Sequence, residues 1–538
     1  MMPTVSHDED APVSSEPPEM PAAKDPAFIA WLIAGCIALW LRWVFATNAG
    51  ALWRDEANSV ALSTLPSIRD VWNHLEYDSF PILWMLAIRC VHNLSGDSDF
   101  AYRLFGLAAT SLTVIVLALI ARDTPIRWPV FSTVLLGLNP SVIHWGGSSR
   151  AYGWGMLAYT VMFWTFWRNA RCPNARNCAW ASAAAIISVQ TLYYNSFLTA
   201  ALVAGGCAAV LVMRGPLCKL VYIVVPAALA ALSLLPYVVV FRRLHKWSDM
   251  VTSDVTLGWL LQKFHDAVGT PSTIVFSVWI GLATIVLIVG VLSLLLRRKH
   301  ALQPDLSFTA FSLVNLVFAV PFYFGFLLAL KYTTQPWYYL DLMTVLALSV
   351  DSLLMPALNR KKYRIIAPIF ALLYAAVFVA PVLSTITVRQ TNIDLIASMI
   401  GRAATPRDYV LLDVWHAVTF SRYYHGTAAW DTMPPIPFHK YHRYDLVKRL
   451  LGKKDTMEPV FEHCAAALKR GGRVIVVGPV SNDGVYWTGQ TGAFLASHAQ
   501  NVGYARVDCK LPVSSYECPT LQVFDGWRTN ANTPRQRW

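Results

Sequence analysis

Long apolar segments recur through the first 386 residues, and each is about as long as a helix that crosses a lipid bilayer. They run over about residues 27–47, 101–121, 128–145, 150–168, 179–193, 196–213, 219–240, 272–296, 307–330, 337–355 and 365–386. A helix needs roughly 17–25 mainly apolar residues to cross about 30 Å of hydrocarbon. The pattern therefore predicts a polytopic α-helical membrane protein with about 11 transmembrane helices.

The composition excludes an ordinary soluble protein. Of the 538 residues, 55% are hydrophobic and only 14% are charged, whereas soluble domains carry about 25% charged residues. The net charge of +12 would suggest a nucleic-acid partner in a soluble chain. Here much of the Lys and Arg lies in short clusters between apolar segments, so we interpret the charge as a topology signal and expect no nucleic acid.

Basic clusters fall in alternate loops between the apolar segments. They are Arg122/Arg127, Arg168/Arg171/Arg176, Arg214/Lys219, Arg297/Arg298/Lys299 and Arg360/Lys361/Lys362/Arg364. Cytoplasmic loops carry the excess of positive charge, so these loops are predicted to be cytoplasmic. Residues 48–100, the hinge Ser148–Arg150 and the C-terminus then lie on the outer side. The apolar segment Pro81–Leu94 is too short to span and is expected to lie on the outer surface as an interfacial helix.

Three regions follow from this topology. Residues 1–25 are acidic and rich in Pro, Ser and Ala, which is typical of a disordered tail, here cytoplasmic. Residues 26–386 form the transmembrane domain, whose outer loop 48–100 carries an acidic motif. Residues 387–538 contain two strand-like segments, 408–414 and 473–480, with a helical pattern between them, and are predicted to form an extracytoplasmic α/β domain.

The cysteines indicate no metal site. None of the nine has the paired spacing of zinc ligands. Cys509 and Cys518 lie close together in the outward domain, where either a disulfide or two free thiols would fit. We predict the disulfide because the compartment is oxidising.

The strongest local signal is the adjacent pair Asp55 and Glu56, directly after the first apolar segment. Charge alone would fit a solvated loop. However, the following outward residues are rich in aromatics and contain the interfacial helix, so the pair should lie at the lipid boundary. A carboxylate there needs a partner or a function.

Several motifs, in this order, resemble one family. They are RDE at 54–56, FPILWMLAI, GDSDFAYRLFGLAA, NPSVIHWGGSSRAYGW, YYNSF and QPWYYLDLMTVLAL. The series is similar to that of the polyprenyl-phosphate-sugar-dependent glycosyltransferases of the GT-C superfamily, family 39 type, which includes protein O-mannosyltransferases and the aminoarabinose transferase of lipid A. The resemblance implies a GT-C membrane fold with a C-terminal α/β domain.

The resemblance also implies the reaction. It would be an inverting transfer of a single sugar from a polyprenyl-phosphate carrier to a glycan, lipid or protein hydroxyl, at the outer face of the cell's inner (cytoplasmic) membrane. By similarity Asp55 would be the general base, with Glu56 as the second candidate catalytic carboxylate. A positioned base contributes roughly 10²–10⁴ in rate, and the leaving phosphate needs cations. No cofactor is required; a divalent metal is left open, although no metal-ligand pattern is evident.

Outward cations are candidates to hold the donor phosphate. Arg150 is the first choice because it lies in a tight hinge between two spans and its planar guanidinium suits phosphate. The alternative is an ion pair with Asp55 or Glu56 that only shapes the site. The other candidates are Arg54, Arg242, Arg243, His245, Lys246 and Lys331. The cluster at 242–246 would equally suit lipid headgroups, and Lys331 would equally suit a snorkelling position.

Most of the aromatic residues are expected in the interfacial belts. Trp53, Tyr152, Tyr194 and Trp337 are candidates to contact the sugar or the prenyl chain. The sequence departs from the family in two places: Ser79-Phe80 stands where relatives commonly have a basic residue or His, and Trp337-Tyr338 stands where they often have Arg-Tyr. These departures leave the identity of the phosphate ligands open.

Two other function classes remain as alternatives. One is a transporter or flippase of lipid-linked saccharides, and the other is an outward-facing binding or assembly protein. Transporters tend to have inverted repeats and ionisable residues near the bilayer midplane, whereas the ionisable residues here gather at the outer edge. The sequence therefore favours the glycosyltransferase, and an inert Asp55 would favour the alternatives.

Overall fold

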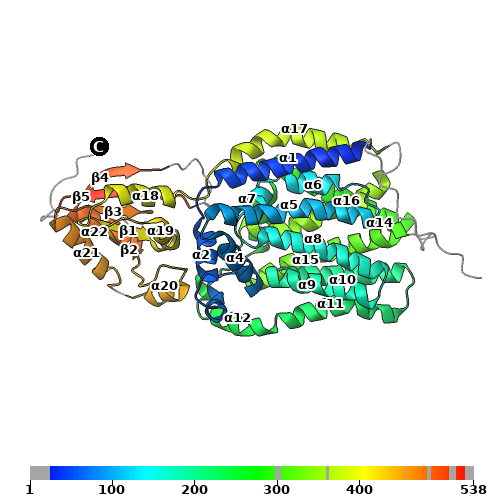
Figure 1. Ribbon diagram of the computed structural model, residues 1–538, viewed down its shortest axis with the longest axis horizontal. Helices are drawn as coiled ribbons and strands as arrows, with labels where there is room; N and C mark the ends of the chain where they lie inside the picture. Colours follow the sequence, from blue (N-terminus) through cyan, green and yellow to red (C-terminus); the bar gives the residue numbers. More distant parts are fainter. Residues whose placement is uncertain are drawn as a thin grey trace, which may run out of the picture.

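The computed structural model describes residues 25–296, 304–358, 363–453, 455–481, 486–507 and 517–527. Most of the predicted tail 1–25, the basic clusters at 297–299 and 360–362, and Cys509 lie outside these ranges. The described chain forms a helical bundle and a smaller part built around a sheet, which lie side by side along the long axis (Figure 1).

Each predicted apolar segment forms helix. The helices are α1 (Pro26–Asn48), α5 (Asp99–Asp123), α6 (Val130–Gly137) continued by α7 (Pro140–Gly146), α8 (Tyr152–Arg171), α9 (Ala175–Thr191), α10 (Asn195–Val212), α11 (Leu220–Ser233) continued by α12 (Val238–Leu244), α14 (Thr273–Leu296), α15 (Pro304–Leu330), α16 (Leu340–Leu358) and α17 (Ile366–Ile386). In the described ranges, 8 helices are long and apolar enough to span a membrane. This confirms a multi-pass helical membrane protein, while the count of 11 stays unconfirmed.

One predicted span is broken between Gly137, where α6 ends, and Pro140, where α7 begins. Pro lacks the backbone N–H that would continue the helix, and Asn139 instead caps α7 by accepting from Ser141 N at 2.9 Å. The break frees carbonyls of α6. Arg42 of α1 donates to Gly137 O and Leu136 O, each at 3.4 Å, so this buried guanidinium has a structural explanation.

Helix α16 runs through the centre of the bundle, and 83% of its spanning window is buried. Its Asp351 accepts hydrogen bonds from Phe131 N at 3.1 Å and Ser132 N at 2.7 Å. These are the first backbone N–H groups of α6, which have no partner within their own helix. A side chain of the central helix thus caps a neighbouring one.

Short helices cover one end of the bundle. They are α2 (Arg54–Ser63), α3 (Ile68–Asn73), the 3-10 turn Leu75–Tyr77, α4 (Ile82–Ser95) and α13 (Leu257–Val268). Helix α4 is the predicted interfacial segment, and its 14 residues are too few for a span. Arg89 of α4 donates to Ser63 O at 3.1 Å and Leu65 O at 2.6 Å, so α4 is fixed to the end of α2.

The C-terminal part is the predicted α/β domain. Its five-stranded sheet has the order β2-β1-β3-β5-β4, with β1 (Tyr409–Asp413) parallel to β2 (Ala429–Met433) and β3 (Val474–Val477). The antiparallel strands are β4 (Gln500–Ala505) and β5 (Leu521–Asp525). The helices are α18 (Ile393–Ala403), α19 (Ala417–Tyr423), α20 (Tyr444–Leu450), α21 (Glu458–Lys469) and α22 (Trp487–His498). The strands predicted at 408–414 and 473–480 are β1 and β3.

Apolar side chains on both faces of this sheet are buried, as expected for parallel strands. Val410 and Leu412 pack with Ile396 of α18 on one face, while Leu411 and Val476 belong to the cluster on the other face. Cys518 is disulfide-bonded, and Cys509, its predicted partner, lies outside the described residues.

Salt bridges dock the α/β part on the same end of the bundle. Arg422 of α19 lies 2.8 Å from both Asp97 and Asp99 at the start of α5. Tyr423 donates to Asp99 at 2.6 Å and accepts from Leu52 N at 2.9 Å. The α/β part is therefore held at a fixed position beside α2.

Candidate active site

A cavity of about 380 Å³ lies at the junction of the two parts, where Figure 1 places α2, α12 and α20. The bundle contributes most of its wall, and the α/β part contributes Trp415, His442 and Tyr444. Of the residues singled out from the sequence, the lining includes Arg54, Asp55, Arg150, Tyr152, Tyr194, Trp337 and Tyr338. One cavity therefore gathers side chains that are up to 390 positions apart in the numbering.

Asp55 lies in the first turn of α2 and faces the cavity. Its Oδ1 accepts from Arg54 Nε at 2.9 Å and lies 4.0 Å from His442 Nε2. Burial raises the pKa of Asp55, but the positive charges of Arg54 and Arg150 outweigh it and hold that pKa below its ordinary value. A negative charge at a helix N-terminus is also stabilised by the backbone dipoles. Asp55 is therefore an ionised carboxylate at neutral pH.

Arg150, in the hinge between α7 and α8, forms an ion pair with Asp78. Its Nη1 lies 3.0 Å from Asp78 Oδ1 and donates to Ser59 Oγ at 2.6 Å and to Asp55 O at 2.9 Å. The partner is thus neither of the carboxylates considered from the sequence. Arg150 Nε is buried and has no hydrogen-bond partner, so the guanidinium keeps one donor for a ligand.

Glu56 points away from the cavity. It forms a fully buried ion pair with Arg103 of α5 and accepts from Ser149 N at 2.6 Å and Trp53 N at 3.1 Å. The bond from Trp53 N closes the capping box of α2. All these contacts are structural: they fix the start of α2 to α5 and to the hinge.

Five of the candidate cations do not line the cavity, and two of them, His245 and Lys246, are exposed. Arg242 and Lys331 are exposed, and Arg243 pairs with Glu76, with Nε 3.2 Å from Oε2. Lys331 lies between two residues that do line it, Leu330 and Tyr332. Arg54 and Arg150 are thus the two arginines of the described chain that reach the cavity.

Tyrosines form a large part of the wall. Tyr194 packs against Tyr338 with ring centroids 5.3 Å apart, and Tyr338 packs against Tyr152 at 6.1 Å and Tyr332 at 5.9 Å. The hydroxyl of Tyr194 is buried without a hydrogen-bond partner. An unpaired polar group in such a wall is costly unless a ligand satisfies it.

Part of the cavity wall is apolar and reaches the outer surface of the bundle. Phe241 of α12 is 43% exposed and Leu330 at the end of α15 is 39% exposed, and both line the cavity. In a membrane protein such exposed apolar side chains face lipid. The cavity therefore joins a charged interior to an apolar rim.

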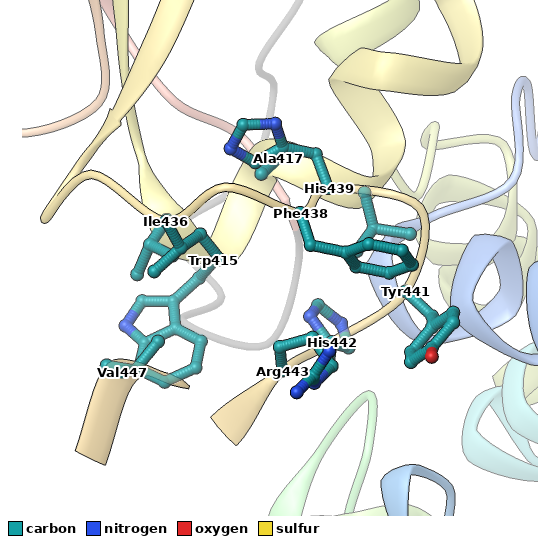
Figure 2. Close-up of a pocket in the computed structure, with 11 residues that line it drawn as sticks. Trp415, Ala417, Ile436, Phe438, His439, Tyr441, His442, Arg443 and Val447 are labelled. Carbon is teal, nitrogen blue, oxygen red and sulfur yellow. The ribbon is translucent and has the colours of Figure 1, made fainter. Parts of the chain in front are cut away.

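The sequence reasoning missed Asp78, Arg103 and His442. A charged residue inside an otherwise apolar segment is a signal that could have identified Arg103. Asp78 and His442 have no comparable local signal. Figure 2 shows His442 beside Tyr441 and Arg443, on the segment that follows β2.

We next consider whether the described side chains could bind a metal ion. Within the described ranges, no group of three or more His, Cys, Asp and Glu side chains is placed to hold a metal ion. The chemistry that these residues can perform on their own is proton abstraction by Asp55 and stabilisation of an anion by two arginines and hydroxyl donors.

No family model matches the chain, and no curated protein matches it in sequence. Its structure is similar to that of ArnT from Cupriavidus metallidurans bound to undecaprenyl phosphate, with a TM-score of 0.54 and 12% identity over 94% of this chain and 99% of that chain. It also matches the oligosaccharyltransferase AglB from Archaeoglobus fulgidus in complex with an inhibitory peptide and a dolichol-phosphate, with a TM-score of 0.47 and 11% identity over 91% of this chain and 75% of that chain. The likeness to ArnT covers almost the whole of both chains and confirms the GT-C membrane fold.

Proposed function

We propose that the protein is an inverting glycosyltransferase that moves a single sugar from a polyprenyl-phosphate carrier to a hydroxyl acceptor at the outer face of the inner (cytoplasmic) membrane. The observation that carries this proposal is an ionised carboxylate, Asp55, in a cavity that joins two arginines to an apolar, lipid-facing rim. The fold is shared with ArnT, which was crystallised with undecaprenyl phosphate. The proposal places the N-terminus in the cytoplasm and residues 387–538 outside.

The carrier lipid would enter along the apolar rim. Its prenyl chain would lie against Phe241 and Leu330 and remain in hydrocarbon, where its apolar surface avoids water. Its phosphate would then reach the charged interior.

We assign the donor phosphate to the Arg150 side of the cavity. Arg150 Nε and the Tyr194 hydroxyl are buried donors without a protein partner, and a phosphate oxygen would satisfy each of them. Asp78 neutralises part of the Arg150 charge. The phosphate would share this cation and gain its help as charge develops on the leaving group.

Asp55 would then act as the general base. It takes the proton of the acceptor hydroxyl, the acceptor oxygen forms a bond to the anomeric carbon, and the bond from that carbon to the phosphate oxygen breaks. The electron pair of the broken bond leaves with the phosphate. Attack from the face opposite the phosphate inverts the anomeric configuration.

We assign Glu56 a positioning function rather than a catalytic one. Its carboxylate is satisfied by Arg103, Ser149 N and Trp53 N and does not line the cavity. It therefore holds Asp55, its neighbour in the same helical turn, in place.

The test is a transfer assay with the full-length protein in lipid nanodiscs. A panel of polyprenyl-phosphate sugars is offered with a cell-envelope acceptor fraction, and released polyprenyl phosphate and the anomeric configuration of the product are measured. Asp55→Asn keeps the size of the side chain and removes its basicity, so kcat should fall by roughly 10² or more while donor binding is kept. Asp254→Asn, an exposed outer-loop carboxylate, is the matched control.

Retention of the configuration, or near wild-type turnover of Asp55→Asn, would contradict the mechanism. If no donor is consumed but a lipid-linked saccharide crosses the bilayer, the protein is a transporter.

A further inference from the structure

The carboxyl ends of two parallel strands of the α/β part lead directly into the cavity. Strand β1 ends at Asp413 and is followed by Trp415, and β2 ends at Met433 and is followed by the segment that carries His442. In open α/β sheets, ligands bind outside the carboxyl ends of the strands, where the strand order reverses. The order β2-β1-β3 places that reversal between β1 and β3, so the segment that follows β1 lies beside it. The edge of the sheet that is suited to a ligand is therefore a wall of this cavity.

His442 is fixed at this wall by the membrane part. Its backbone N–H donates to Asn58 Oδ1 at 2.8 Å, and Asn58 Nδ2 donates to Tyr77 O at 3.0 Å. The His442 side chain is buried, and its Nε2 has no hydrogen-bond partner. Burial lowers the pKa of His442 to about 3, so the ring is neutral and offers one N–H donor and one acceptor nitrogen.

His442 and Trp415 also separate the large cavity from a smaller one. The smaller cavity, of about 10 Å³, lies behind them and is lined by Ile436, His439 and Val447 among others (Figure 2). Its volume is about that of one water molecule. His442 thus lines both cavities, and the space behind it is much smaller than the cavity in front.

Aromatic rings from both parts of the protein complete this wall. Trp247 stacks on Tyr444 with centroids 4.7 Å apart and an interplanar angle of 16°, and Trp415 lies 5.7 Å from Tyr444. The indole Nε1 of Trp247 is buried without a partner. Apolar and aromatic walls with a few fixed polar groups are typical of small-ligand sites.

We propose that this wall is the acceptor subsite, and that it holds a sugar ring whose reacting hydroxyl lies between Asp55 Oδ1 and His442 Nε2. The inference rests on the proposed glycosyl transfer and names its acceptor class as a saccharide. The ring would contact Trp415 and Tyr444, and another of its hydroxyls would accept from Trp247 Nε1.

The distance between the two groups fits one bound hydroxyl. Asp55 Oδ1 and His442 Nε2 are 4.0 Å apart, so an oxygen at about 2.8 Å from each can hydrogen-bond to both at an angle of about 90°. The hydroxyl donates its proton to Asp55 and accepts from the imidazole N–H. In the transfer step the proton moves to Asp55, and His442 keeps its proton throughout.

The experiment compares four variants of the full-length protein in nanodiscs. His442→Phe keeps the ring shape and removes both nitrogens, His442→Gln restores an N–H donor, and Trp247→Phe keeps the stacking and removes the indole N–H. His439→Phe, a histidine on the same segment that does not line the large cavity, is the matched control.

Two measurements are made on each variant. Saturation-transfer NMR with methyl glycosides of common hexoses and pentoses reports acceptor binding without any turnover, and undecaprenyl phosphate binding reports the donor side. We expect His442→Phe to weaken glycoside binding about tenfold, the usual scale for one lost hydrogen bond. His442→Gln should recover part of this loss, and undecaprenyl phosphate binding should stay unchanged.

Equal glycoside binding by His442→Phe and wild type would overturn the subsite, as would an equal loss of donor binding. Binding of a serine-containing peptide or a long-chain alcohol in place of the glycosides would overturn the acceptor class. Specific glycoside binding without any transfer would support the subsite and count against the proposed transfer, so the two failures are distinguishable.

Discussion

Arg150 and Asp78 form an ion pair at the wall of the cavity, with Nη1 3.0 Å from Oδ1 and side chains that are 4% and 1% exposed. Removing one member leaves the other charge buried without a partner, which typically costs about 3–5 kcal/mol. Arg150→Ala should therefore lower the unfolding temperature as well as raise the KM for the lipid donor.

A double variant separates these two effects. Arg150→Ala with Asp78→Ala removes both charges and should recover most of the lost stability in a thermal unfolding assay. It should not recover donor affinity if Arg150 holds the phosphate. Full recovery of the donor KM would show that the pair is only structural and that the phosphate is held elsewhere.

The pH dependence of kcat/KM tests the state of the base. The active form of Asp55 is the carboxylate, which is lost only as the pH falls through the Asp55 pKa. Because burial is outweighed by Arg54 and Arg150, that pKa lies below its ordinary value of 3.8. We expect no loss of kcat/KM from Asp55 between pH 8 and about pH 5. A transition near pH 6.5 would contradict both an ionised Asp55 and a neutral His442.

Glu56 supports the site through its buried pair with Arg103. Glu56→Gln keeps the shape of the side chain but leaves the Arg103 guanidinium uncompensated, so the protein should lose about 3–5 kcal/mol of stability. Glu462→Gln, an exposed glutamate of α21, should change stability by less than about 0.5 kcal/mol. Chemical denaturation in mild detergent measures both.

Measuring the activity of the Glu56→Gln variant tests separately whether Glu56 is catalytic. The fraction that remains folded should keep the donor KM, since Glu56 does not line the cavity. A normal unfolding curve with a turnover loss of 10² or more would instead give Glu56 the catalytic part that the sequence first suggested.

Labelling of single cysteines tests the topology. Ser95→Cys and Asp254→Cys lie at exposed positions in segments that are predicted to lie outside, and they should react with an impermeant maleimide from outside the cell. The native Cys172, exposed in the loop between α8 and α9, should react only after permeabilisation. Labelling of Cys172 from outside would reverse the membrane orientation and move the cavity to the cytoplasm.

Much of the helical architecture is predictable because each span must supply enough apolar length by itself. Asp55 could be identified for a similar reason, because it directly follows the first span and can be recognised from the neighbouring sequence alone. Asp78, Arg103 and His442 were missed because their meaning depends on partners that are distant in sequence. Arg150 was identified, but its partner was not, since nothing in the hinge indicates that Asp78 lies opposite.

The same limit applies to the sheet. Strands β1 and β3 are buried apolar runs and could be predicted, whereas the hydrogen bond from His442 N to Asn58 spans 384 residues. No pattern in the flanking sequence encodes it. The contribution of the α/β part to the cavity is thus a property of the folded chain.

The side chains that close the cavity come late in the chain. Trp415, His442 and Tyr444 follow all the membrane helices in sequence, and the sheet that positions them is complete only with β5, which ends at Asp525. A nascent chain therefore holds its inserted helices in the bilayer before its site exists. Synthesis thus separates membrane insertion from the completion of the cavity.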